Sequence, residues 1–184
     1  MRCKTRFGVV AILLFLGAGL HVDTPLEAAG AVVLPGSVRS MLDAKYPGWQ
    51  PSQVGADVQA FVRERSSVAS ANIIKGDFDG NGRTDYAVLL EYPSGPQVGA
   101  INWLQLVAFL AAKKSFNLIV LNDPIPSEPQ FYITLQRKGA RGYNLATYKR
   151  FRYPHDSIGM WYFGVAGGTF IYSNGRFRHV AESD

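Results

Sequence analysis

From residue 72 onward the chain is a succession of short apolar runs, each bounded by residues that favour turns. Runs rich in β-branched and aromatic residues that recur at roughly 10–15 residue intervals are typical of strands. We predict strands at 84–92, 103–111, 116–121, 131–136, 143–147, 160–165, 169–172 and 177–180. The segment 103–121 is predicted to form a hairpin, and 143–147 is predicted to pair with 131–136. The pattern therefore indicates a meandering, mainly antiparallel β-sheet.

Two segments before this region have other patterns. Residues 32–50 carry apolar side chains at helical spacing and end at Pro47-Gly48, so we predict a short helix there. Residues 55–65 fit either a helix or a strand. The sum is an α+β fold, with one or two N-terminal helices followed by the sheet, and 32–184 is predicted to be a single α+β domain.

The first 31 residues have the layout of a secretory signal peptide. Arg2, Lys4 and Arg6 precede an apolar run at 7–20, and small residues follow at 28–31. The alternative is an uncleaved anchor, but the run is shorter than the about 20 residues of a spanning helix. We expect a periplasmic or secreted protein with no membrane span after signal removal. The single cysteine, Cys3, lies in the predicted signal, so no disulfide is expected.

The segment 77–85 has the composition of a calcium-binding loop. Its oxygen-bearing residues are spaced at alternate positions, which lets a compact loop surround one hard cation. The predicted ligands are Asp77, Asp79, Asn81 and Asp85 by their side chains and Arg83 by its backbone carbonyl. The alternative is a metal-free hairpin in which the Asp and Asn side chains cap their own turn.

The loop departs from the EF-hand pattern in two ways. An EF-hand has a glutamate at position 12, where this chain has Val88, and the flanking segments have strand character. Gly82, by contrast, agrees with the EF-hand pattern at position 6, where the sharp turn needs a residue without a Cβ. Glu91 and Asp57 are possible distant donors that would complete the coordination of the ion. A strand–loop–strand calcium site is therefore expected.

Residues 76–88 resemble the calcium loop of FG-GAP/VCBS-type repeats. In that family the loop links two strands and binds calcium structurally, and Asp77, Asp79, Asn81, Arg83 and Asp85 match its ligand positions. The family normally has several copies of the loop, one for each propeller blade. This chain has one copy, so the resemblance implies a structural calcium site and does not imply a propeller.

The remaining features leave two functions open. The formal net charge of +5 fits either a solvated surface or an acidic partner, such as a protein or an anionic polysaccharide of the cell envelope. Export argues against a nucleic-acid partner. The sequence His155-Asp156-Ser157 lacks a nucleophile-elbow motif, so a polar loop is the expected interpretation. The leading hypothesis is a non-enzymatic exported binding or inhibitor-like module with one calcium loop.

The alternative hypothesis is an envelope hydrolase acting on a polysaccharide or a peptide. Such an enzyme needs two carboxylates that converge in a cleft. The candidate carboxylates are Glu64, Glu91, Glu128 and Asp156.

Overall fold

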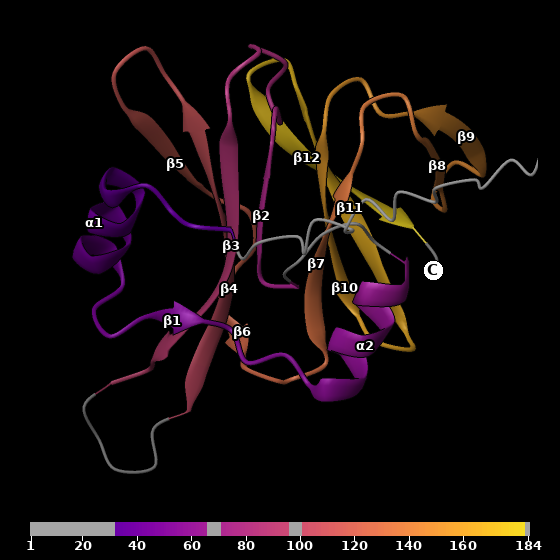
Figure 1. The fold of residues 1–184 in the computed structure, drawn as a ribbon. Helices are drawn as coiled ribbons and strands as arrows, with labels where there is room; N and C mark the ends of the chain where they lie inside the picture. The colour runs from indigo at the N-terminus through magenta and orange to yellow at the C-terminus, as the bar shows by residue number, and fades with distance from the viewer. Residues whose placement is uncertain (1–31, 66–70, 96–100, 183–184) are drawn as a thin grey trace, which may run out of the picture.

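The computed structural model describes residues 32–65, 71–95 and 101–182, and the predicted signal peptide lies outside these ranges. Two helices precede most of the strands (Figure 1). The elements are α1 (Gly36–Lys45), β1 (Gln50–Pro51), α2 (Ala56–Arg65), β2 (Ile73–Gly76), β3 (Asp85–Pro93), β4 (Asn102–Ala111), β5 (Phe116–Val120), β6 (Ile125–Pro126), β7 (Phe131–Gln136), β8 (Arg141–Asn144), β9 (Lys149–Arg152), β10 (Ser157–Tyr162), β11 (Ala166–Ser173) and β12 (Arg176–Glu182). The predicted α+β class is confirmed, and 55–65 contributes a helix.

The strands form two main sheets and one separate hairpin. The first sheet has the order β1-β3-β4-β5, with β2 also paired to β3 and β6 to β4. The second sheet has the order β12-β11-β10-β7, and β8 pairs only with β9. All of these pairings are antiparallel. β2 also lies beside β7, where the Ile133 N–H donates to the carbonyl of Ala71 at 2.8 Å.

The apolar side chains divide the molecule into four layers. Leu89 and Leu106 on the inner face of the first sheet pack with Ile133 and Ile158 of the second sheet. The other face of the first sheet is covered by α1, and the other face of the second sheet by α2 (Figure 1). β3 and β4 are therefore buried on both faces, which explains why their sequences are nearly continuous apolar runs.

One predicted pairing is wrong. The segment 143–147 was expected to pair with β7, but β7 pairs with β10, with Ile133 opposite Met160. The residues 141–144 instead fold back on 149–152 to form the β8–β9 hairpin. The strands predicted at 160–165 and 169–172 correspond to β10 and β11, and β11 begins earlier than predicted, at Ala166. Local turn residues did not reveal these differences, since the choice of partner strand depends on burial between the sheets.

The 103–121 hairpin is confirmed as β4 and β5. None of the helices in the described part of the chain is long and apolar enough to cross a membrane.

Candidate metal centre

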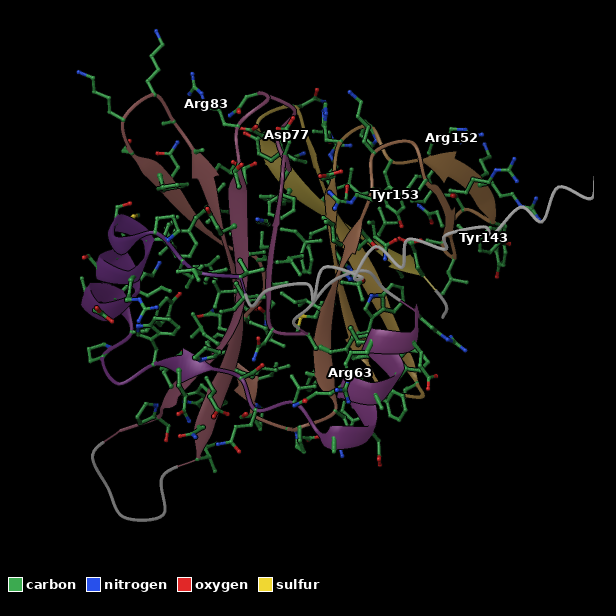
Figure 2. All side chains as sticks on the ribbon, in the orientation of Figure 1. Arg63, Asp77, Arg83, Tyr143, Arg152 and Tyr153 are labelled. Carbon is green, nitrogen blue, oxygen red and sulfur yellow. The ribbon has the colours of Figure 1, made fainter. Side chains whose placement is uncertain are left out.

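The loop 77–85 connects the end of β2 to the start of β3, at the upper end of the first sheet in Figure 1. The two strands pair up to its base, where Gly76 lies opposite Asp85. The loop is thus held as the tip of a hairpin, and its flanks are strands, as the sequence predicts. Asp77 and Arg83 are labelled at this tip in Figure 2, at the same end of the molecule.

Side-chain oxygens inside the loop accept hydrogen bonds from its own backbone. The Asn81 N–H donates to Asp79 Oδ1 at 3.0 Å, and the Arg83 N–H donates to Asn81 Oδ1 at 2.8 Å. The Gly82 N–H donates to Asp77 Oδ2 at 3.1 Å. These bonds hold the loop in a compact turn around its own side chains.

Three carboxylates meet inside this loop. One oxygen each of Asp77, Asp79 and Asp85 can be chosen so that the three lie within 4.8 Å of one another. The Oδ1 atom of Asp77 is buried and has no hydrogen-bond partner. Such an atom is costly to bury unless a positive ligand offsets the loss of water. The arrangement fits the oxygen donors that a hard divalent cation prefers.

Asp85 is the most deeply placed member of the three. It is fully buried, and its two oxygens accept 2.7 Å hydrogen bonds from the N–H groups of Phe78 and Ala111. The pKa of Asp85 is raised to about 6, mainly by burial and also by the charge of Asp79, while backbone hydrogen bonds oppose the shift. A cation beside this carboxylate would favour its charged form and lower that pKa.

Asn81 joins the loop to the adjacent strand. Its amide nitrogen donates to Asp79 Oδ2 at 2.8 Å and to the carbonyl of Ala111, at the end of β4, at 3.0 Å. Arg83 has an exposed side chain, as expected for a residue that contributes only its carbonyl. The roles of Asn81 and of the Arg83 carbonyl as ligands remain predictions.

Two residues from the β9–β10 connection pack against the loop, and sequence reasoning did not place them there. Asp156 Oδ2 accepts from the Asp77 N–H at 3.3 Å, and Oδ1 accepts from the Lys138 N–H at 3.0 Å. Arg137 forms an ion pair with Asp156 at 3.3 Å. The ring of His155 lies directly over Gly80. These contacts tie the loop to the second sheet.

The sequence carried no signal for these contacts, because Asp156 is 79 positions from Asp77.

Residues 155–157 do not have the geometry of a catalytic triad. The Ser157 hydroxyl donates to the backbone carbonyl of His155 at 3.2 Å, not to its ring, and His155 Nδ1 has no hydrogen-bond partner.

The distant donors considered for the ion do not reach the loop. Glu91 lies on β3 six positions beyond Asp85, which is about 20 Å along an extended strand. Its oxygens accept from Gln50 Nε2 at 2.6 Å and from the Ser127 hydroxyl at 2.7 Å. Asp57 lies in the first turn of α2. Among the described residues, neither joins the three clustered aspartates.

Three of the four carboxylates considered for a hydrolase accept hydrogen bonds from different donors. Glu91 accepts from Gln50 and Ser127 as described above, Glu128 Oε2 accepts from the Tyr162 hydroxyl at 2.7 Å, and Asp156 accepts from the Asp77 and Lys138 N–H groups. Glu64 is exposed on α2. These contacts give the hydrolase hypothesis no specific support.

Comparisons of the chain with family models, with curated proteins and with solved structures found no match.

Proposed function

We propose that this protein is an exported binding module in which the loop 77–85 holds one structural calcium ion. The observation that carries the proposal is the cluster of Asp77, Asp79 and Asp85, whose carboxylate oxygens approach within 4.8 Å while Asp77 Oδ1 is buried without a partner. Three negative charges at this separation repel one another, and a divalent cation converts the repulsion into attraction. The resemblance to FG-GAP/VCBS-type loops supports calcium as that cation.

The position of the loop supports a structural role for the ion. The loop contacts the first sheet through Asn81 and the carbonyl of Ala111, and the β9–β10 connection through Asp156. An ion that fixes the loop therefore also fixes the end of β4 and the start of β10. The predicted mature chain has no cysteine, so this ion would provide a cross-link that disulfides do not.

The test is calcium titration by calorimetry, combined with thermal melts in calcium and in chelator. A ligand that binds only the folded state at one hundred times its Kd stabilises it by about 2.7 kcal/mol. We expect measurable heat and a higher Tm in calcium. Magnesium should give a smaller shift, because it demands octahedral geometry and retains its waters.

The matched variants are Asp79→Ala and Asp123→Ala, which remove the same charge. Asp79 belongs to the cluster, whereas Asp123 is exposed in the loop before β6. We expect Asp79→Ala to lose both the heat and the Tm shift, and Asp123→Ala to retain them. The calcium proposal fails if the wild-type protein shows neither effect, or if both variants keep the full response.

A further inference from the structure

The β8–β9 hairpin carries a concentration of positive charge that the calcium loop does not explain. The segment 137–152 has six basic residues and no Asp or Glu: Arg137, Lys138, Arg141, Lys149, Arg150 and Arg152. Only one of these is neutralised by an ion pair in the described part of the chain, namely Arg137 with Asp156. The hairpin stands at the edge of the molecule, where Tyr143 and Arg152 are labelled in Figure 2.

The register of the hairpin gathers three of its arginines on one face. Arg141 lies directly opposite Arg152, and Tyr143 lies directly opposite Arg150. Residues that face each other and residues two apart share one face of a ribbon, so these four side chains lie together. All four are exposed. Like charges placed directly opposite each other destabilise a strand pair, so the sheet gains nothing from this arrangement.

The opposite face attaches the hairpin to the rest of the protein. The ring of Phe151 lies against Gly142 and also contacts the ring of Tyr153, with 5.1 Å between the ring centroids. The Tyr143 N–H donates to Glu182 Oε2 at 3.3 Å, and the Leu145 N–H donates to the carbonyl of Ala181 at 3.1 Å. The arginine face is therefore turned outward to solvent.

The carboxylate of Glu182, which contacts the hairpin at the Tyr143 N–H, forms no ion pair with these arginines in the described part of the chain. Both oxygens of Glu182 accept hydrogen bonds from the buried hydroxyl of Tyr153, at 2.8 and 2.9 Å, and Glu182 is only 6% exposed. Arg152 uses one nitrogen to donate to the carbonyl of Gly139 at 2.7 Å. The remaining guanidinium donors are available to a ligand in solution.

The hairpin tip adds an aromatic side chain beside these charges. Tyr148 is 79% exposed and has a φ of 53°, a left-handed conformation that is unfavourable for a bulky residue. Exposed backbone outliers of this kind gather at binding sites. Tyr143 therefore lies on the arginine face, and Tyr148 is exposed at the tip of the same hairpin.

We propose that the outward face of the β8–β9 hairpin binds a carboxylate-bearing polysaccharide. A guanidinium presents two parallel N–H groups that match a planar carboxylate, and a tyrosine ring can pack against the apolar face of a sugar. The strand face carries no aliphatic side chain that would enter a membrane, and the predicted export disfavours nucleic acid. The inference rests on the proposed binding role but requires no bound calcium.

The experiment is calorimetric titration with a short oligogalacturonate in chelator, so that calcium cannot bridge the sugar. The test variant is Arg141→Ser/Arg152→Ser. The control is Arg39→Ser/Arg63→Ser, which removes the same charge from exposed positions on α1 and α2. We expect the affinity to fall at least about ten-fold in the hairpin variant, since hydrogen bonds to charged groups contribute strongly. The control should stay within about two-fold of wild type.

A second variant, Arg141→Ser, separates binding from folding. It removes the opposed like charges and keeps the bond of Arg152 to Gly139, so its Tm should not fall while its affinity does. The proposal is overturned if the wild type does not bind the oligogalacturonate, or if the hairpin and control variants weaken binding equally. Tighter binding of dextran sulfate, duplex DNA or anionic vesicles would also overturn it.

The calcium-dependent Tm shift is measured on the same variants. It should persist in Arg141→Ser/Arg152→Ser, because the hairpin side chains do not belong to the aspartate cluster. Loss of sugar binding with an intact calcium response would thus locate the failure in the hairpin proposal alone.

Discussion

Two glycines in the loop 77–85 provide a direct test of how the β9–β10 connection packs against this loop. Gly80 and Gly82 both have a left-handed backbone, with φ of 78° and 79°. A Cβ added at Gly82 would meet nothing within 4 Å, whereas a Cβ added at Gly80 would collide with the ring of His155. The two positions therefore share a backbone cost and differ in a tertiary contact.

The expected magnitudes follow from this difference. An alanine in the left-handed region costs about 1–2 kcal/mol, so Gly82→Ala should lower the free energy of unfolding by about that amount. Gly80→Ala should cost roughly 1–3 kcal/mol more, the usual penalty for inserting a methyl group into a packed site. Rotation of the imidazole does not relieve the contact fully, because its Cγ lies 3.0 Å from the added atom.

The assay is urea unfolding in chelator, so that changes in ion affinity do not enter the measurement. The double variant Gly80→Ala/His155→Ala completes a thermodynamic cycle. In the His155→Ala background, we expect Gly80→Ala to cost less than it does in the wild type, because the ring that the added methyl group meets is gone. Equal destabilisation by Gly80→Ala and Gly82→Ala, or a cycle without coupling, would refute the packing of His155 on the loop.

Three further outcomes are expected. In chelator, the pKa of Asp85 is raised from its ordinary value of 3.8 to about 6 in the folded protein, so the folded state binds the carboxyl proton of Asp85 more tightly than the unfolded chain does. The bound proton stabilises the folded protein fully at pH values below 3.8, and this stabilisation, up to about 3 kcal/mol, is lost as the pH rises through 6. Urea unfolding at several pH values should show this dependence, and Asp85→Asn should remove it. Tyr153→Phe should lower the free energy of unfolding by about 1.5–3 kcal/mol, because buried Glu182 loses its hydroxyl donor. An unchanged midpoint in chemical denaturation would contradict this. Leu104→Ala in the core should cost about 2–5 kcal/mol in the same assay, and Val120→Ala, 40% exposed, much less; similar losses would argue against the four-layer packing.

The sequence determined the features that depend on neighbouring residues. The strand-flanked loop at 77–85 was predictable because the spacing of its oxygens and glycines is local, and the structure brings Asp77, Asp79 and Asp85 together. The 103–121 hairpin was predictable for the same reason, since a short turn joins two adjacent apolar runs.

The tertiary structure decided what local chemistry leaves open. The partner of β7 is β10 rather than the nearer segment 143–147, because Ile133 and Ile158 must both face the inner core. The released segment 141–152 then forms its own hairpin and turns its arginines outward. Asp156 contacts the loop 77–85 although it is 79 positions from Asp77. Contacts at such separations arise from burying the faces of two sheets against each other, and no pattern within a few residues encodes them.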